Sequence, residues 1–406
     1  MSKYEYDKSV LKGLSVGPFL HEVDEREKHI EAADTSAPKS IYNSNILASK
    51  LHPDFLCLKV SSVIDHGVAK EYKLIPDKEF GTEELAYFRA GQYLSVFAEI
   101  GDIQTARPFT ICSSPKDSIS QNPFYKLVVK PVEGGLVTNH LYNTWNEGTK
   151  VLTSAPLGHF YYTSLRDARH VIALAGGSGI TPFYSMASAI VDGIEDFNLT
   201  ILYGSRTEKD IILKDSLKEL ASKSNGKVKL INILSDENND LYEHGFIDAE
   251  FIKKFIETDD YSVFACGPDA MMEFLKPEIS KLGLPFRRYR KEVAGEIVDS
   301  SKYKNLSNLS HSAHKLTIRS FDKTWKIEAF ENITILRNIE NAGIFVPADC
   351  RGGSCGWCRS RLISGKVFVA RDNRRLADDK FGWIHPCCTF PKSDIEIEIY
   401  TNDYKN

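Results

Sequence analysis

Five of the eight cysteines are concentrated within 39 positions: Cys350, Cys355, Cys358, Cys387 and Cys388. Cysteine thiolates are ligands for soft metal ions. The first twenty residues are charged and contain no apolar signal segment, so we expect the chain to stay in the cytoplasm. In that compartment clustered thiols are more typical of a metal or redox site than of a disulfide framework.

The spacing of these cysteines narrows the chemistry. Cys350, Cys355 and Cys358 follow the pattern C-x4-C-x2-C, and 28 residues separate the last of them from Cys387. This is the plant-type spacing for a 2Fe-2S cluster, whereas a structural zinc site usually takes two separated pairs. We therefore expect these four cysteines to hold one 2Fe-2S cluster. Glycines in the loop leave room for backbone N–H groups to approach the sulfurs.

The fourth ligand has two candidates, because Cys387 and Cys388 are adjacent. Cys387-x3-Pro391 resembles the ending of plant-type ferredoxins, in which the ligand stands four residues before a proline. Cys387 is therefore predicted as the ligand and Cys388 as a packed side chain.

A glycine-rich turn predicts a phosphate site near the middle of the chain. It contains Gly176, Gly177, Gly179, Thr181 and Pro182, between an expected strand and an expected helix. Glycines let a pyrophosphate approach the backbone, and the helix N-terminus supplies N–H donors. We expect Thr181 to cap this helix and Pro182 to stand in its first turn. A tight strand–helix turn uses glycine in any case, so the turn alone does not decide the function.

The elements that must position these residues fall into three predicted domains after an extension. Short β-rich runs favour an antiparallel barrel or sandwich, and alternating strands and helices then favour a parallel doubly wound sheet. A third, β-rich part with one short helix follows a Ser- and Asn-rich linker, and the extension holds one polar helix over residues 21–34. The predicted boundaries are 1–45 (extension), 46–165, 166–298, 299–313 (linker) and 314–406.

Composition excludes several function classes. The chain has 51 Lys and Arg against 55 Asp and Glu, a net charge of −4. That balance is wrong for a general nucleic-acid binder or a polybasic membrane binder. No apolar run approaches the roughly 20 residues needed to span a bilayer, so we expect no membrane span. Nothing in the sequence indicates an oligomeric state.

Three short segments upstream of the glycine turn form a second set. They are Gly91-Gln92-Tyr93, Arg107-Pro108-Phe109-Thr110 and Gly134-Gly135-Leu136-Val137-Thr138. Each could be ordinary packing, because Arg–Pro turns are common and Phe109 suits a core. Their order resembles the flavin site of the ferredoxin-NADP reductase superfamily. Downstream, Cys266-Gly267-Pro268 followed by Met271 resembles the C-G-P-x-x-M motif of the same superfamily.

The resemblance covers about residues 50 to 406. The domain order resembles the three-domain reductases of the phthalate dioxygenase reductase, phenylacetyl-CoA epoxidase reductase and hybrid-cluster-protein reductase groups. It implies an antiparallel β-barrel flavin domain, an α/β doubly wound nicotinamide domain and an α+β β-grasp ferredoxin domain. One departure is Ala294, which stands where many members have a phenylalanine that covers the flavin.

The resemblance also implies roles for individual residues. Arg107 would pair with a flavin phosphate, Phe109 would pack on the flavin, and Thr110 would hydrogen-bond the isoalloxazine near N5. Cys266 would lie near the reacting carbon of the nicotinamide. The remaining predicted cofactor-binding residues are Gln92, Tyr93, Pro108, Gly134, Gly135, Val137, Thr138, Gly176, Gly177, Gly179, Thr181, Pro182, Ser205, Arg206, Gly267, Pro268 and Met271.

Cofactor identity is only partly constrained. Ser205 and Arg206 follow an expected strand where this superfamily meets the adenosine ribose. Arg206 could hold a 2′-phosphate and favour NADPH, but the T-E-K-D-I stretch after it resembles cytochrome b5 reductase, which favours NADH. The run from Gly134 to Asn139 resembles flavohemoglobin and favours FAD over FMN, although the phthalate dioxygenase reductase type uses FMN.

The implied function is an NAD(P)H-dependent electron-transfer reductase that serves a redox partner protein. The candidate partners are an oxygenase, a hybrid-cluster protein or another metalloenzyme. A stand-alone reductase of a quinone or ferric chelate, and a redox-sensing binding subunit, stay as alternatives. Residues 314–406 carry a net charge of +3 and the rest carries −7. Six arginines near the cluster loop could therefore steer an acidic surface, or form an ordinary solvated face: Arg351, Arg359, Arg361, Arg371, Arg374 and Arg375.

Overall fold

The computed structural model describes residues 17–32, 42–293, 295–297, 311–320, 323–370 and 376–399. The chain divides into two units, residues 1–50 and 51–406. Helix α1 (Gly17–Ala32) confirms the expected polar helix, whereas α2 (Asn43–Leu51) was not predicted. No helix within these ranges has the length and apolar character needed to cross a membrane.

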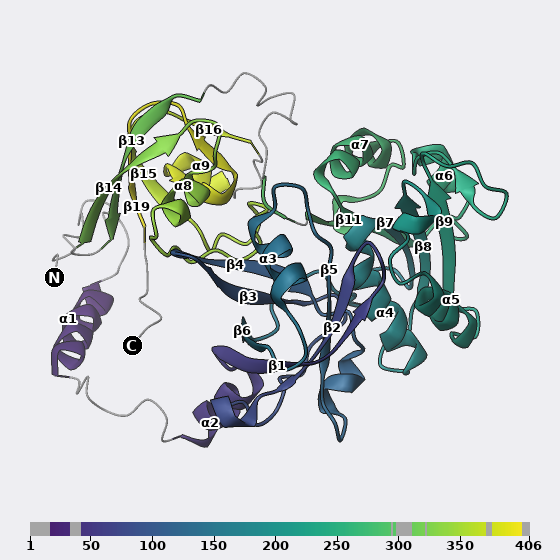
Figure 1. The fold of residues 1–406 in the computed structure, drawn as a ribbon. Helices are drawn as coiled ribbons and strands as arrows, with labels where there is room; N and C mark the ends of the chain where they lie inside the picture. The colour runs from purple at the N-terminus through teal and green to yellow at the C-terminus, as the bar shows by residue number, and fades with distance from the viewer. Residues whose placement is uncertain are drawn as a thin grey trace. The chain divides into compact units, whose positions relative to one another are not determined.

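The first sheet is antiparallel and curled, which gives a half-barrel (Figure 1). Its strands are β1 (Phe55–Asp65), β2 (Lys70–Pro76), β3 (Tyr93–Ile100), β4 (Ile103–Thr110), β5 (Tyr125–Val129) and β6 (Lys150–Ser154), in the order β4-β3-β6-β1-β2-β5. Alternate residues of β1, such as Leu56, Leu58 and Val60, are buried because successive strand side chains face opposite sides. Just after β4, the Cys112 N–H donates to the Lys126 carbonyl of β5 at 2.8 Å, which brings the two edges of the sheet together.

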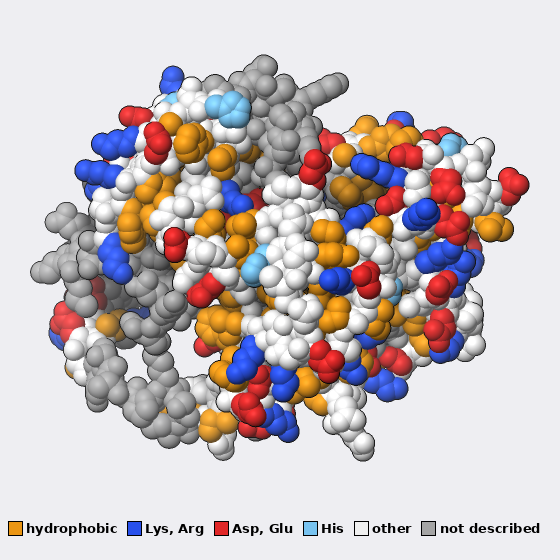
Figure 2. All heavy atoms as spheres, in the orientation of Figure 1, with side chains coloured by type: hydrophobic (Ala, Val, Ile, Leu, Met, Phe, Trp, Pro, Cys, Tyr) orange, Lys and Arg blue, Asp and Glu red, His pale blue; other side chains and the backbone are white. Residues whose placement is uncertain are grey.

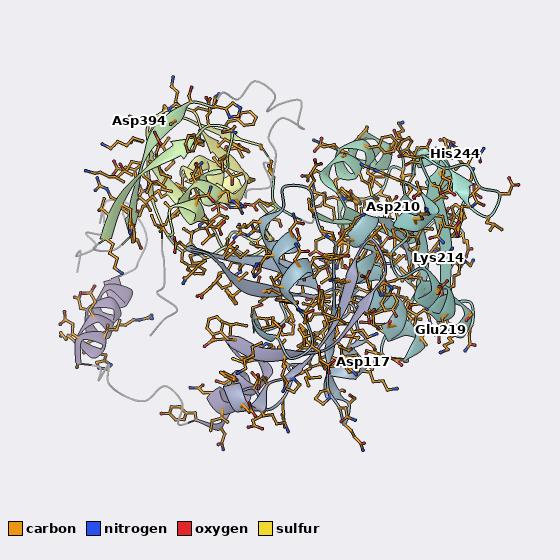
Figure 3. The ribbon with its side chains drawn as sticks, viewed as in Figure 1. Asp117, Asp210, Lys214, Glu219, His244 and Asp394 are labelled. Carbon is orange, nitrogen blue, oxygen red and sulfur yellow. The ribbon has the colours of Figure 1, made fainter. Side chains whose placement is uncertain are left out.

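One helix and one short helical turn complete this part. The helix α3 (Leu136–Thr144) begins after Gly135 and buries Val137 and Leu141. The turn η3 (Pro115–Ile119) is held by a capping box between Ser114 and Asp117. Asp117 is labelled in Figure 3.

The second sheet is parallel and is covered by helices on both faces, as predicted. Its order is β10-β9-β8-β7-β11-β12. The strands are β7 (His170–Gly176), β8 (Asn198–Ser205), β9 (Val228–Leu234), β10 (Glu243–His244), β11 (Tyr261–Gly267) and β12 (Tyr289–Val293), and the helices are α4 (Thr181–Val191), α5 (Lys214–Lys223), α6 (Ala249–Lys253) and α7 (Asp269–Ser280).

Alternation along β7 assigns the helices to the two faces. Val171 and Ala173 join the core of α4 and α5, whereas Ile172 and Leu174 join the core of α6 and α7. Figure 1 shows these helix pairs on opposite sides of the sheet. A strand buried on both faces is the expected environment of a continuous apolar run such as HVIALAG.

The third sheet is mixed, with the order β14-β13-β19-β15-β17. Its strands are β13 (Ala313–Ser320), β14 (Lys323–Phe330), β15 (Ser360–Ser364), β17 (Trp383–Ile384) and β19 (Ile395–Glu398). Helix α8 (Ile335–Asn341) is capped by Thr334 and buries Leu336 and Ile339, so this part has the predicted β-grasp character. A small ribbon of β16 (Val367–Val369) and β18 (Thr389–Pro391) and the short helix α9 (Leu376–Lys380) complete it.

Charged side chains of both signs are interspersed over the face shown in Figure 2, as the near-neutral net charge predicts. Several predictions fall outside the described residues. These are the missing aromatic at Ala294, three of the six arginines (Arg371, Arg374 and Arg375), the segment from 33 to 41, and most of the 299–313 linker.

Candidate functional site

The glycine turn lies at the point of the second sheet where the strand order reverses. From β7 the strands β8, β9 and β10 follow on one side, and the strands β11 and β12 follow on the other. In such sheets ligands bind outside the carboxyl ends of the strands at this point. Gly176 and Gly267 are the last residues of β7 and β11, so both predicted segments meet there.

Close backbone approach explains the glycines. A Cβ on Gly179 would stand 2.2 Å from the Cys266 carbonyl oxygen, and a Cβ on Gly176 would stand 2.4 Å from the Met271 sulfur. Gly177 has a φ of +53°, in the left-handed region that favours glycine. The structure thus joins residues that are about 90 positions apart in sequence into one surface.

The start of helix α4 corrects one prediction. Thr181 does not cap the helix: the N-cap is Ile180, and Thr181 is already helical. Its hydroxyl instead donates to the Ser178 carbonyl at 2.9 Å, within the short turn η4 (Gly177–Ile180). Pro182 stands in the first turn, as predicted.

Tyr203, which sequence analysis missed, braces the glycine turn. Its hydroxyl donates to the Gly177 carbonyl at 3.0 Å and accepts the Ile212 N–H at 3.1 Å. A tyrosine within an apolar strand gave no signal of this, because the contact depends on the strand order.

The predicted ribose residues lie at the same edge. Ser205 is the last residue of β8, and Arg206 follows it with an exposed side chain. The next turn is fixed by Asp210, whose carboxylate accepts from the Thr207 N–H and hydroxyl at 3.2 and 2.9 Å (Figure 3).

Cys266 is a buried, neutral thiol at the end of β11. Burial, with a smaller contribution from Glu292, raises its pKa well above the ordinary value. The thiol therefore stays protonated, so it is suited to contact rather than to acid–base chemistry.

Glu292 links the two halves of the site. It pairs with Cys266 across β11 and β12. Burial raises the pKa of Glu292 to about 8, and the neighbouring Cys350 and Asp349 add to the shift. The carboxyl group therefore lies within electrostatic reach of both the β11 end and the cysteine loop.

The predicted flavin segments are cross-strand neighbours. In the β3–β4 pair, Tyr93 faces Thr110 and Leu94 faces Phe109. Pro108, Phe109 and Thr110 are partly exposed, as a cofactor surface requires. Gln92 instead holds its own turn: its amide accepts the Arg89 N–H at 2.8 Å and donates to the Gly158 carbonyl at 3.2 Å.

The Gly134–Thr138 segment fits a phosphate. Gly134 has a φ of +71°, and Gly135 precedes the first turn of α3. The Thr138 hydroxyl is buried and has no hydrogen-bond partner among the described residues. A Cβ on Gly135 would stand 2.6 Å from that hydroxyl, so the glycine keeps the space beside it open. A buried donor beside an open loop suits a phosphate oxygen.

Arg107 is placed differently from the predicted phosphate contact. Its guanidinium pairs with Glu296 and donates to the Thr105 hydroxyl at 2.6 Å and the Ala106 carbonyl at 2.9 Å. Burial and the neighbouring Arg351 lower its pKa to about 10. The predicted contact with a flavin phosphate stays a prediction.

The four predicted cluster ligands contact one another in two pairs, Cys350 with Cys355 and Cys358 with Cys387. Backbone N–H groups already point at sulfurs: that of Cys355 donates to Cys350 at 3.3 Å, and that of Trp357 to Cys355 at 3.5 Å. Among the described residues, no group of three or more His, Cys, Asp or Glu side chains is arranged to hold a metal ion. Two pairs of thiols and N–H donors to sulfur fit a two-iron cluster.

Thiolate formation is favoured at two of these cysteines. A hydrogen bond from Cys355 lowers the pKa of Cys350 to about 6. Hydrogen bonds from Cys358 and Cys388 lower the pKa of Cys387 well below the ordinary value. Cys387 and Cys388 are both buried, and the Cys388 sulfur also lies 3.5 Å from the His385 carbonyl oxygen, so Cys387 as the fourth ligand stays a prediction.

Arg351 cannot steer a partner, which corrects part of the charge hypothesis. Its side chain is 1% exposed and pairs with Glu340 and with Glu296. Arg359 is exposed, with its guanidinium 3.0 Å from Asp378 and over the Trp383 ring at 4.3 Å. The exposed Arg359 and Arg361 are therefore the described members of that set that can still face a partner.

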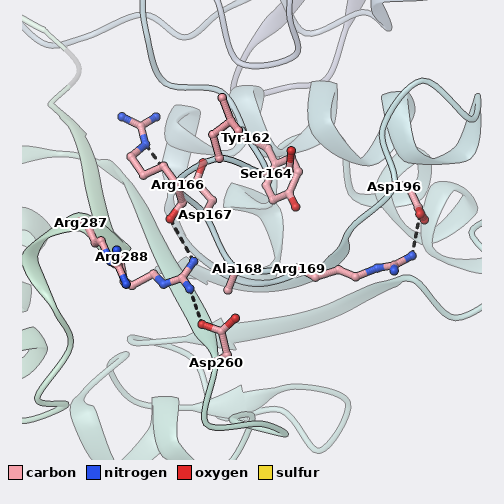
Figure 4. Close-up of a pocket in the computed structure, with 11 residues that line it drawn as sticks. Tyr162, Ser164, Arg166, Asp167, Ala168, Arg169, Asp196, Asp260, Arg287 and Arg288 are labelled. Carbon is pink, nitrogen blue, oxygen red and sulfur yellow. Dashed lines mark hydrogen bonds and ion pairs between the residues drawn. The ribbon is translucent and has the colours of Figure 1, made fainter.

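A separate pocket lies at the opposite edge of the second sheet (Figure 4). Its lining residues, such as Arg169, Asp196, Asp260 and Arg288, all precede strands, so it opens at their amino ends. Arg169–Asp196 and Arg288–Asp260 ion pairs cross it. It is separate from the predicted nicotinamide residues, which lie at the carboxyl ends of the strands.

Comparison with known proteins identifies each part. Residues 79–162 match the oxidoreductase FAD-binding domain, residues 173–276 the oxidoreductase NAD-binding domain, and residues 319–392 the 2Fe-2S iron–sulfur cluster binding domain. Each match lies inside the predicted domain, and the exact boundaries stay predictions.

Relatives align with most of this chain. The E component of 1,2-phenylacetyl-CoA epoxidase from Escherichia coli K12 is 28% identical over 332 residues, which cover 78% of this chain and 90% of the relative. The glycine betaine monooxygenase reductase of Chromohalobacter salexigens is 24% identical over 333 residues, covering 78% and 88%. The structure of phthalate dioxygenase reductase matches with a TM-score of 0.61 and 24% identity, over 86% of this chain and 98% of that one. The chain belongs to the ferredoxin reductase-like oxidoreductases that unite FAD-binding, NAD-binding and 2Fe-2S domains in one polypeptide.

Proposed function

We propose that this electron-transfer reductase takes hydride from NAD(P)H and delivers single electrons to a separate oxygenase component. The proposal rests on contacts that bring residues of the predicted nicotinamide, flavin and cluster sites close to one another. Glu292 is paired with Cys266 at the predicted nicotinamide site and is within electrostatic reach of the cluster ligand Cys350. Tyr93, itself a predicted flavin residue, donates a hydrogen bond to Asp349, the residue before that ligand.

Bound flavin supplies the step between two-electron and one-electron chemistry, because it exchanges electrons both ways. The chain supplies binding and orientation. The Gly176–Gly179 turn admits the dinucleotide backbone, and Cys266 contacts the nicotinamide as a neutral thiol. The Thr138 hydroxyl donates to a flavin phosphate, and Thr110 hydrogen-bonds the flavin near N5.

The oxygenase partner is inferred from the relatives. Their names describe the reductase of a monooxygenase and a component of an epoxidase. A cytoplasmic location belongs to the same proposal, because the cluster ligands must stay reduced. NADH is the proposed donor, and exposed Arg206 is the residue whose replacement would test the choice against NADPH.

An anaerobic titration of the purified protein with NADH and with NADPH tests the function, together with flavin extraction and an iron and sulfide assay. We expect extracted FAD, a 2Fe-2S cluster, and bleaching of the flavin followed by bleaching of the cluster. Purified, reconstituted protein without flavin or acid-labile sulfide would contradict the proposal. Rapid reduction of an added oxygenase component would support the partner class, whereas reduction of quinones alone would favour a stand-alone reductase.

A further inference from the structure

The two residues that flank the cluster ligand Cys350 both reach the first sheet. Asp349 accepts a hydrogen bond from the Tyr93 hydroxyl at 2.6 Å and another from the Ser95 hydroxyl. Tyr93 and Ser95 are two apart on β3, so they face the same side of the sheet. Asp349 is 6% exposed, and this contact spans more than 250 positions of sequence.

Arg351 makes the matching contact with β4. Its Nε donates to the Ala106 carbonyl at 2.6 Å, and Nη2 donates to the Thr105 hydroxyl at 2.7 Å. Nη1 and Nη2 both donate to the carboxylate of Glu340 on α8, Nη1 at 3.1 Å. Nη1 also donates to the Glu296 carboxylate at 3.4 Å. A planar guanidinium is thus bonded to both sides of the contact, which an ammonium could not reproduce.

The backbone at Arg351 is strained. Its φ is +51°, in the left-handed region that non-glycine residues seldom adopt. Residues keep such conformations where the surroundings hold them, typically at functional sites. The conformation turns the guanidinium into the contact, while Gly352 and Gly353 continue the loop.

We propose that Asp349 and Arg351 are positioning residues that clamp the cluster loop onto β3 and β4, and so set the rate of electron transfer from flavin to cluster. The clamp rests on the proposed function, because Tyr93 and Arg107 on these strands are predicted flavin residues. One NAD(P)H gives NAD(P)⁺, one proton and two electrons, and each electron passes singly to the cluster and on to a one-electron acceptor. The clamp acts on that passage and leaves the hydride step alone.

Anaerobic stopped-flow measurements with NADH separate the two steps by their absorbance bands. We compare the wild type with Asp349→Asn, Arg351→Met and Tyr93→Phe. Flavin bleaching is expected at the wild-type rate in Asp349→Asn and Arg351→Met. Cluster bleaching is expected to slow several-fold, because a loop that is no longer held against β3 and β4 lengthens the average path from flavin to cluster. The matched control is Arg319→Met, which removes an exposed ion pair with Glu396 in the same domain.

Two readouts do not depend on turnover. Hydrogen–deuterium exchange should quicken at the amides of 350–353 and 93–95 in the variants. Iron content and the electron paramagnetic resonance signal of the dithionite-reduced cluster should stay at wild-type levels. If Arg351→Met loses its cluster, Asp349→Asn decides, because it keeps the size of the replaced side chain. Tyr93→Phe changes a predicted flavin residue, so it is compared by amide exchange alone.

The outcomes divide cleanly. Slow cluster bleaching with intact cofactors and faster amide exchange supports the clamp. Wild-type cluster bleaching in both Asp349→Asn and Arg351→Met overturns it. If NAD(P)H does not bleach even the wild type, the proposed function fails. The amide exchange then still tests the clamp by itself, and unchanged exchange overturns it.

Discussion

Two of the places where distant segments meet, the glycine turn and the contact of the cluster loop with β3 and β4, are held by different kinds of interaction. At the glycine turn the contact is a close approach of backbone: a Cβ on Gly179 would stand 2.2 Å from the Cys266 carbonyl oxygen. At the junction, buried polar and charged side chains meet, and its members are Tyr93, Ser95, Thr105, Arg107, Glu296, Glu340, Asp349 and Arg351.

The difference predicts how each region fails. The glycine turn depends on shape, so adding one methyl group should damage it. The junction depends on charge balance, since burial alone would raise the pKa of Glu296 while Arg107 and Arg351 bring it below its ordinary value. Removing one charge there leaves its partner buried and unpaired in a low-dielectric environment.

The largest effect is expected from the cluster ligands beside the junction. Cys387→Ser should lose iron and the cluster absorbance, and electron delivery to a protein acceptor should fall to background. NADH should still bleach the flavin, because the glycine turn is untouched. Iron assay and stopped-flow spectroscopy check both points. Cys388→Ser is the matched control, and a cluster lost there but kept in Cys387→Ser would reverse the ligand assignment.

Glu340→Gln should be the most destabilising change within the junction. Glu340 and Arg351 are each about 1% exposed, and the variant leaves the arginine without its main counter-charge. We expect the free energy of unfolding to fall by about 3 kcal/mol. Denaturant unfolding measures it. Asp196→Asn, which removes the charge that exposed Asp196 shares with Arg169 and Lys227, should cost far less, because solvent screens these pairs. Equal losses in the two variants would remove the distinction between buried and exposed charge.

Gly179→Ala should break the other region. Its Cβ would overlap the Cys266 carbonyl, and overpacking of this kind costs about 1–3 kcal/mol. The KM for NADH should rise about 10-fold, since small displacements weaken positioning strongly. Gly204→Ala is the control, because its Cβ would meet Ile247 and Ala175 at ordinary contact distances of 3.6 and 3.7 Å. A normal KM in Gly179→Ala would show that the turn can relax.

The smallest effect concerns pH and belongs to the second sheet. Burial lowers the pKa of His170, whose ring lies 3.3 Å from the Thr200 hydroxyl. Just below pH 6.5 the unfolded chain therefore binds more protons at His170 than the folded chain does, so the contribution of His170 to stability should fall as pH drops through that range. Unfolding curves of the wild type and of His170→Asn between about pH 5 and pH 8 measure it as a difference, because the shifts of other groups such as Glu292 are common to both proteins and cancel.

Sequence patterns predicted most of the architecture. Alternation indicated the antiparallel strands, and continuous apolar runs such as HVIALAG indicated the parallel ones, because burial on one or two faces leaves a direct imprint. The glycine turn and the cysteine spacing were also readable, since each is local. Helix α2 was missed because its exposed side chains leave no periodic pattern.

The junction could not be predicted, because it joins residues about 250 positions apart. Steering of a partner and an ordinary solvated face are both predictions that place Arg351 at the surface, and both are wrong for it, since an arginine beside a cysteine loop looks the same in sequence whether buried or exposed. Thr181 was interpreted as a cap because its type and place fit, but the turn η4 moved the helix start by one residue. The contact of Tyr203 with Gly177 could not be predicted either, because it depends on the order of the strands in the sheet.

The contacts made by Asp349 and Arg351 have a consequence for exchanging modules. Three-domain reductases invite cutting and splicing, with the iron–sulfur end treated as a cassette. In this chain the iron–sulfur domain is bonded to side chains of the first sheet: Asp349 to Tyr93 and Ser95, and Arg351 to Thr105. A chimera with a ferredoxin domain from another protein would therefore need the matching residues on the first sheet as well.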